Sequence, residues 1–277
     1  MEATATMTTR PDTRIMAVFC DFENVALGVR DAKYAAFDIK KVLERLLLKG
    51  NIVVKKAYCD WQRYKEFKAA MHEAAFELID IPHVRQSGKN SADIRMVVDA
   101  LDLCYTKSHV DAFVIISGDS DFSPLVSKLR ENNKLVIGVG VKNSASDLLI
   151  ANCDEFIYYD DLARQAEQAR SGRRRTRAAA KPAEKAAPSG DEERRQEAFD
   201  VVIETIEDLL EERDSEEKIW GSMVKQALKR RKPGFNETYH GFKTFGKLLE
   251  EARDRKLLEI EHDPKSGGYI IQKVLAH

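Results

Sequence analysis

The chain has 277 residues, of which 43% are hydrophobic and 33% charged, and its 45 basic residues nearly balance its 46 acidic ones. This length fits one or two domains, and the apolar content is too high for a wholly disordered chain. The apolar runs are far shorter than the roughly 20 residues that cross a bilayer. The four cysteines are scattered, with no zinc-site spacing, and no apolar leader is visible. We therefore expect a soluble, cytoplasmic protein without a membrane span.

The charge is unevenly distributed along the chain. Residues 164–196 carry ten basic and five acidic side chains and contain no Val, Ile, Leu, Met or aromatic residue. Such a segment cannot bury enough apolar surface to offset the entropy lost on ordering. We therefore predict a flexible N-terminus over 1–13, a first domain over 14–163, a basic disordered linker over 164–196 with helix only at its ends, and a second domain over 197–277.

The first domain alternates strand-like and helix-like segments. Apolar, β-branched runs predict strands over Ile15–Cys20, Ile52–Tyr58, Leu78–Pro82, Ala112–Ser117, Leu135–Val141 and Glu155–Tyr159. Helical periodicity predicts helices over Phe37–Leu48, Trp61–Ala75, Ala92–Thr106 and Phe122–Asn132. The pairs Gly50-Asn51 and Asn132-Asn133 lie where the C-caps of the first and last of these are expected. This alternation indicates a three-layer, Rossmann-like α/β domain around a mostly parallel sheet.

Acidic residues follow two of these strands. Asp21 comes directly after the first strand, in the run DFEN, and Asp119 and Asp121 follow the fourth, in the run GDSD. Asp93, at the start of a predicted helix, can reach the same edge of the sheet, where ligands of parallel sheets collect. Clustered carboxylates repel each other, and a fold tolerates them most easily around a divalent cation. Oxygen ligands favour Mg²⁺ or Mn²⁺, so we predict one such metal site.

Each of these residues also has a structural interpretation. Asp21 alone is equally consistent with a helix N-cap, and Asp93 with a first-turn acid that interacts with the helix dipole. Asn24 fits either a turn or a polar group that orients Asp21 or a phosphate. Lys89 fits either a phosphate contact or a solvated side chain. Glu23 is expected to point away from the site and to pair with a Lys.

Other polar residues near the strand ends are weaker candidates. Asp99 lies more than a helical turn beyond Asp93, Asp147 is ranked as an outer ligand, and Asp154 as a cap. Ser117 fits a turn as well as a phosphate contact. No GxSxG and no Gly-rich phosphate loop occurs in the sequence, which argues against a serine nucleophile and a nucleotide-binding loop.

The acidic segments together resemble a known family. The runs FCDFENV, GKNSADIRMVVDAL, DAFVIISGDSDFSPLV and NSASDLLIANCDEFIYYDDL are similar to the NYN domain, more closely its LabA/DUF88 branch, over residues 14–163. The resemblance implies a PIN-like fold and a metal-dependent ribonuclease. It assigns the metal to Asp21, Asp93, Asp119 and Asp121, with Asn24 beside the first acid. The family commonly has Lys-Gly-hydrophobic-Asp where this chain reads Lys-Asn-Ser-Ala-Asp, so the role of the lysine is left open.

The second domain is predicted to be a small helical module. Helical spacing predicts helices over Gln196–Glu212 and Lys218–Lys229 and a third that starts at Asn236, followed by strands over Leu257–Glu261 and Gly268–Gln272. Three helices and a β-hairpin indicate a winged helix-turn-helix. The run WGSMVKQALKRRKPGFNETYHGFKTFGKLLEEA resembles the OST-HTH, or LOTUS, domain, which implies RNA binding or, in some cases, protein binding.

Basic side chains of the linker and the second domain are candidates for weak phosphate contacts. They are Arg173, Arg174 and Arg175 in the linker and Lys225, Lys229, Arg230, Arg231 and Lys243 in the module. Such contacts give affinity without base specificity, and the net charge of −3 over 197–277 argues against a uniformly basic surface. A solvated spacer and a protein-binding module are the alternatives.

The whole chain is thus expected to be an Mg²⁺- or Mn²⁺-dependent endoribonuclease that acts on single-stranded or structured RNA. Two other classes fit the same residues. One is a non-catalytic adaptor that binds RNA or a protein partner. The other is a DNA nuclease or phosphatase that uses the same acids.

Overall fold

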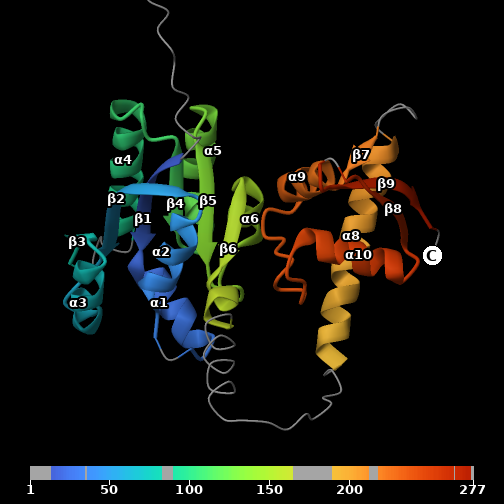
Figure 1. The fold of residues 1–277 in the computed structure, drawn as a ribbon. Helices are drawn as coiled ribbons and strands as arrows, with labels where there is room; N and C mark the ends of the chain where they lie inside the picture. The colour runs from blue at the N-terminus through green and yellow to red at the C-terminus, as the bar shows by residue number, and fades with distance from the viewer. Residues whose placement is uncertain are drawn as a thin grey trace, which may run out of the picture. The chain divides into compact units, whose positions relative to one another are not determined.

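The computed structural model describes residues 14–34, 36–82, 90–164, 189–211, 218–264 and 266–275. It divides into two compact units, Met1–Ala163 and Arg164–His277, and each is described by itself (Figure 1). None of the helices described is both long and apolar enough to span a membrane.

The first unit is built on a six-stranded sheet in which every neighbouring pair is parallel. Its strands are β1 (Arg14–Asp21), β2 (Gly50–Cys59), β3 (Glu77–Asp80), β4 (Ala112–Ile116), β5 (Leu135–Gly140) and β6 (Glu155–Tyr158). Their spatial order is β3-β2-β1-β4-β5-β6. All of β4 and most of β1 and β5 are buried, which is why these runs are apolar on both faces of the strand.

Helices cover both faces of this sheet and complete three layers (Figure 1). They are α1 (Phe22–Asp31), α2 (Ile39–Leu47), α3 (Lys65–Glu73), α4 (Ser91–Thr106), the 3₁₀ turn η1 (Ser120–Phe122), α5 (Ser123–Glu131) and α6 (Asp147–Asn152). One core cluster joins the sheet to α1, α2 and α3, and a second joins it to α4, α5 and α6. The predicted three-layer α/β architecture is confirmed.

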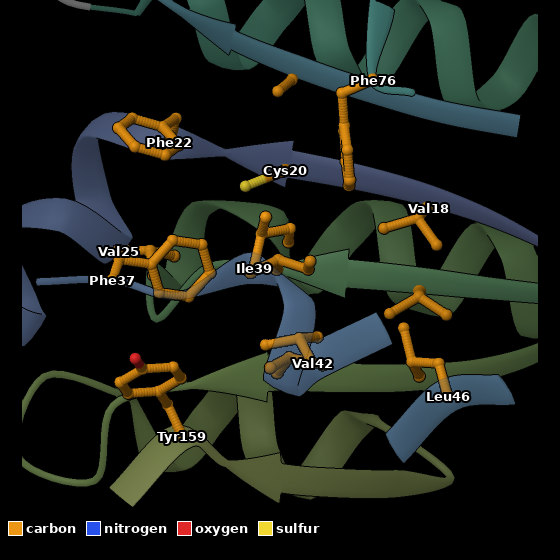
Figure 2. Packing of buried hydrophobic residues seen from close by; sticks show 14 of the residues in the cluster. Val18, Cys20, Phe22, Val25, Phe37, Ile39, Val42, Leu46, Phe76 and Tyr159 are labelled. Carbon is orange, nitrogen blue, oxygen red and sulfur yellow. The ribbon is translucent and has the colours of Figure 1, made fainter. Parts of the chain in front are cut away.

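Figure 2 shows the first cluster from close by. Val18 and Cys20 of β1 point toward Val42 and Leu46 of α2, and all four side chains are fully buried. The helical spacing of the two α2 residues places them on one stripe that faces the sheet. Removing a side chain such as Leu46 by substitution with Ala would cost about 2–5 kcal/mol.

The strand order reverses between β1 and β4. After β1 the chain builds outward through β2 and β3, then returns to place β4 on the other side of β1. In parallel sheets such a reversal opens a crevice beyond the carboxyl ends of the two strands, where ligands bind. Because Cys20 pairs with Ile116, the residues that follow them, Asp21 and Ser117, meet at this crevice.

The predicted strands are all present, but some local predictions are wrong. The helices α1 and α6 were not predicted. Gly50 is not a C-cap: α2 ends at Leu47 with Leu48 as its C-cap. Gly50 opens β2, where a Cβ atom would lie 2.2 Å from the carbonyl oxygen of Arg14. Glycine is required there by close strand packing. Asn133 does adopt the left-handed conformation after α5, with φ 58°, as expected for the end of a helix.

The second unit contains helices and a small antiparallel sheet. Its elements are α8 (Ser189–Glu211), β7 (Ile219–Trp220), α9 (Gly221–Arg231), α10 (Phe245–Asp254), β8 (Leu258–His262) and β9 (Tyr269–Val274). The sheet order is β7-β9-β8. Helix α8 begins inside the segment that was predicted as a linker, and β7 adds a third strand to the predicted hairpin.

The third predicted helix of this unit starts later than expected. Asn236 does not open it: the Asn236 side chain accepts a hydrogen bond from the Thr238 backbone N–H at 3.1 Å and closes a local turn. Gly241 then adopts a φ of 87°, which a helix cannot continue through. Thr244 is the actual N-cap of α10, because its hydroxyl accepts from the Lys247 N–H at 3.2 Å.

Candidate functional site at the β1–β4 crevice

Asp21 is the last residue of β1 and is only 7% exposed. One carboxylate oxygen accepts a hydrogen bond from the Asn24 backbone N–H at 3.3 Å and so caps α1. The other accepts from the hydroxyl of Ser117, just past β4, at 3.0 Å. The expected N-cap role is therefore real, yet it uses only one oxygen and leaves the carboxylate fixed in the crevice.

Asn24 joins the first helix to the end of β4. Its side-chain oxygen accepts a hydrogen bond from the backbone N–H of Gly118 at 2.8 Å. Gly118 has no room for a side chain, since a Cβ atom would lie 2.5 Å from the carbonyl oxygen of Ser144. The glycine of the GDSD run therefore allows β4 and the loop after β5 to meet behind the acids.

Asp119 and Asp121 lie on the turn that follows β4. The Asp119 backbone N–H donates to the Ser117 hydroxyl at 3.1 Å, so Ser117 bridges Asp21 and Asp119. An Asp119 carboxylate oxygen accepts from the Asp121 N–H at 3.0 Å and caps η1. Asp121 itself is exposed. One acid of the pair thus shapes the turn, and the other extends from it.

Asp93 enters from the first turn of α4 and lines the same groove as Asp121. Burial, followed by the negative charges of Asp119 and Asp121, raises the pKa of the Asp93 carboxyl. Burial and the charge of Asp93 raise the pKa of Asp21 to about 7, although hydrogen bonds from Asn24 and Ser117 act in the opposite direction. Carboxyl groups from three distant segments therefore share one electrostatic environment.

The negative charge of this pocket has no basic partner among the described side chains. No Lys or Arg in that part of the chain forms an ion pair with Asp21, Asp93, Asp119 or Asp121. In the same ranges, no three His, Cys, Asp or Glu side chains are already arranged as a metal-holding group. The four predicted metal ligands are thus linked by electrostatic interactions and by hydrogen bonds through Ser117, and they are not already arranged around a common metal position.

Nearby candidates turn out to be structural. Asp99 accepts hydrogen bonds from Tyr58 and Arg95, both at 2.9 Å, and lies 3.3 Å from the Lys56 ammonium. It therefore ties α4 to β2. Glu23 pairs with Arg63 at 2.9 Å, so the expected Lys partner is wrong.

The two acids that follow β5 differ in their surroundings, and the ranking of Asp147 as an outer ligand stays a prediction. Asp154 accepts from the Val136 N–H at 2.8 Å and pairs with Arg130 at 3.2 Å. Asp147 is exposed in the first turn of α6, whose N-cap is Ser146.

The basic residues predicted to contact phosphate are in varied surroundings. Lys225 pairs with Glu237 at 2.6 Å, and Arg231 pairs with Asp208 and, at 3.4 Å, with Glu204. Arg230 and Lys243 are exposed, whereas Lys229 is half-buried. Lys89, Arg173, Arg174 and Arg175 lie outside the described residues.

Comparison with known proteins bears on the first unit. The NYN domain family matches residues 15–160 of this chain. A protein of Xenopus tropicalis named meiosis regulator and mRNA stability factor 1 is 26% identical over 147 residues, which are 53% of this chain and 8% of that protein. An uncharacterized protein of Methanocaldococcus jannaschii is 28% identical over 112 residues, which are 40% of this chain and 43% of that protein.

One solved structure is also similar, that of a protein of unknown function from Vibrio parahaemolyticus. It is 27% identical and covers 55% of this chain and 98% of its own, with a TM-score of 0.49. The chain spans less than half the length of either named relative, and both of these matches are too short to cover both units.

Proposed function

The chain belongs to the NYN domain family, and on that premise we propose that its first unit hydrolyses RNA phosphodiesters with the help of Mg²⁺ or Mn²⁺. Membership supports a nuclease, since the family consists largely of nucleases. The name of the Xenopus tropicalis relative, an mRNA stability factor, supports RNA as the substrate. The observation that carries the proposal is the acidic pocket at the reversal point of the sheet.

The donor set of this pocket fits a hard divalent cation. All four candidate groups, Asp21, Asp93, Asp119 and Asp121, offer carboxylate oxygens, which Mg²⁺ and Mn²⁺ prefer. Their charge is uncompensated by basic side chains in the described ranges. Burial, and after it the charge of the neighbouring acids, raises the pKa of Asp21 and Asp93. A divalent cation bound there would stabilise the negative charge that develops on the phosphodiester and would make water a better nucleophile.

The residues around the acids have positioning roles in this proposal. Ser117 and the Asn24 backbone hold the two oxygens of Asp21 in one orientation. Because the side-chain oxygen of Asn24 is engaged by Gly118, its amide N–H groups are left to donate to a phosphate oxygen. Asp121, the most exposed of the acids, has the freedom to move toward the substrate.

We further propose that the second unit is a LOTUS-like module that brings RNA to the first. Exposed Arg230 and Lys243 are its candidate phosphate contacts. A tether between the units raises the effective concentration of bound RNA at the acidic pocket, so even weak binding by the module would help. The acidic partners of Lys225 and Arg231 favour the second candidate function, a protein-binding adaptor, because these cations are already neutralised.

A substrate and metal panel tests the proposal. The full chain is incubated with single-stranded RNA, single-stranded DNA and p-nitrophenyl phosphate, each in Mg²⁺, in Mn²⁺ and in EDTA. We expect cleavage of RNA that depends on the metal and ceases in EDTA. Full activity in EDTA would refute the metal role, preference for DNA or p-nitrophenyl phosphate would favour the other hydrolases, and no cleavage at all would favour the adaptor.

A further inference from the structure

A groove of about 710 Å³ opens beside the acids, between α4 and α5. Asp93 and Asp121 line it together, and its walls are mainly apolar. Ile94 and Val98 of α4 form one side, and Leu148 of α6 also contributes. We call this the α4–α5 groove. It adjoins the acidic cluster of Asp21, Asp93, Asp119 and Asp121, because two of these four acids also line the groove.

The apolar side chains of the α4–α5 groove are unusually exposed. Ile94, Val98 and Leu148 are 62%, 55% and 58% exposed, respectively. A single exposed aliphatic residue is common on protein surfaces. Three that line one groove form an apolar patch of the kind that marks a binding surface. None of the three belongs to the core cluster on this face of the sheet, which contains residues such as Met96 and Leu129.

We propose that the α4–α5 groove binds an unpaired nucleobase of the RNA, next to the phosphodiester held at the acids. This inference rests on the proposed nuclease function. A base has flat faces suited to Ile94 and Val98 and polar edges suited to Asn90 and Ser127, which also line the groove. A phosphate suits the groove poorly, because no described lining residue is basic and two lining residues are acidic.

The groove also specifies the form of the RNA. A base in a duplex has both faces stacked and its pairing edge occupied, so it cannot enter, whereas bases of single strands, loops and bulges can. The groove is therefore a subsite that a base of a duplex cannot occupy.

Methyl NMR of the full chain tests the inference without requiring cleavage. The Asp119→Asn variant in Mg²⁺ is titrated with a short single-stranded RNA and, separately, with the same RNA carrying abasic residues. Ring currents of a bound base should shift the methyl resonances of Ile94, Val98 and Leu148. The methyl groups of Leu47, which is 59% exposed on α2, serve as the matched control and should not move. The abasic RNA should leave all four residues unshifted.

Kinetics of the wild-type background supply the second readout. The double substitution Ile94→Ala and Val98→Ala should lower kcat/KM for single-stranded RNA by roughly 10-fold, and Leu47→Ala should leave it unchanged. Both changes are at exposed positions, so the fold should persist.

The outcomes separate the two proposals. Methyl shifts without cleavage by the wild type would retain the base-binding groove and reject the nuclease. Cleavage by the wild type with no shifts and no loss in the double variant would reject the groove and retain the nuclease. Shifts of the same methyl groups that depend on protein concentration alone would also reject the groove as a base site, because a second copy of the chain would be its occupant.

Discussion

The acidic cluster of the first unit differs from several basic side chains of the second unit in how its charge is compensated. In the first, four acids at the ends of β1 and β4 and the start of α4 have no basic partner among the described residues. In the second, Lys225, Arg231 and Lys247 are each paired with a carboxylate of the same unit. Charge that a fold leaves uncompensated points to an external ligand, whereas paired surface charge contributes little beyond local structure. This difference supports the proposal that the chemistry takes place in the first unit.

The largest effect should come from neutralising one unpaired acid. Asp119→Asn should lower the rate of RNA cleavage by at least about 100-fold, because the charge is lost while the amide oxygen can still accept from the Asp121 N–H and keep the turn. Asp99→Asn, in an acid that is already paired, should leave the rate unchanged. Single-turnover cleavage at pH 7 measures both. Equal losses in the two variants would show that pairing does not distinguish functional from structural acids.

Gly118 and the loop after β5 are packed so closely that one added methyl group should destabilise the first unit. Gly118→Ala would place a Cβ atom 2.5 Å from the Ser144 carbonyl oxygen, and such overpacking should destabilise the first unit by about 1–3 kcal/mol. Gly268→Ala in the second unit meets nothing nearer than 3.4 Å and should be tolerated. Urea unfolding followed by Trp61 fluorescence in a Trp220→Phe background measures the first unit, and Trp220 fluorescence in a Trp61→Phe background measures the effect of Gly268→Ala on the second. A stable Gly118→Ala variant would contradict the packing argument.

The pKa values of two aspartates of α4 are shifted in opposite directions: that of Asp93 is raised and that of Asp99 is lowered. Asp99 gives the cleaner test of how stability depends on pH. Burial would raise the pKa of Asp99, but hydrogen bonds from Tyr58 and Arg95 and the charge of Lys56 hold it below its ordinary value. A carboxyl group whose pKa is lower in the folded state than in the unfolded state stabilises the fold. This contribution is complete above the pKa of the unfolded state, near 4, and is lost as the pH falls through the lower pKa of the folded state.

Asp99→Asn should therefore destabilise the first unit by about 1–2 kcal/mol at pH 7. The difference from wild type should shrink below pH 4. Urea unfolding at pH 7, 5 and 3 provides the comparison, with Asp111→Asn, at an exposed position elsewhere in the unit, as a control for the general effect of removing a carboxylate. A gap that widens at low pH would contradict the assigned direction.

The smallest effects should distinguish free from paired cations in the second unit. Replacing an exposed cation, Arg230→Gln or Lys243→Gln, should reduce the slope of log affinity against log salt by about 1 if it contacts phosphate. Lys225→Gln should instead destabilise the unit by roughly 0.2–1 kcal/mol, because its partner is Glu237. Fluorescence anisotropy with labelled RNA at several salt concentrations measures the slopes. Equal slopes for all three variants would favour the protein-binding alternative.

The sequence was most informative where the pattern is local. The buried strands β1, β4 and β5 are nearly continuous apolar runs, and the less buried β2, β3 and β6 are short β-branched or aromatic runs, so the ends of all six strands could be predicted to within one or two residues. The run GDSD contains its own turn glycine, and the order of the acids along the chain identified the family before any geometry was known. Helix α1 could have been predicted from the helical spacing of Phe22, Val25 and Val29. The run DFEN in the same segment was instead assigned only to the acidic motif.

Features that depend on distant contacts could not be predicted. The partnership of Asp21 with Ser117 joins residues 96 positions apart and follows from the adjacency of β1 and β4, which the sequence does not state. The same holds for Arg63, which pairs with Glu23 in place of the expected Lys. In the second unit, the left-handed Gly241 breaks a stretch whose apolar spacing alone predicted a helix.

Binding of Mn²⁺ to the full chain tests the central claim most directly, because it requires neither substrate nor turnover. Titrations followed by electron paramagnetic resonance should show saturable binding to the wild type and to Asp99→Asn. Asp93→Asn and Asp119→Asn, which change acids on separate segments, should each weaken binding by at least about 10-fold. Identical titrations for all four proteins would contradict a cation shared by these acids.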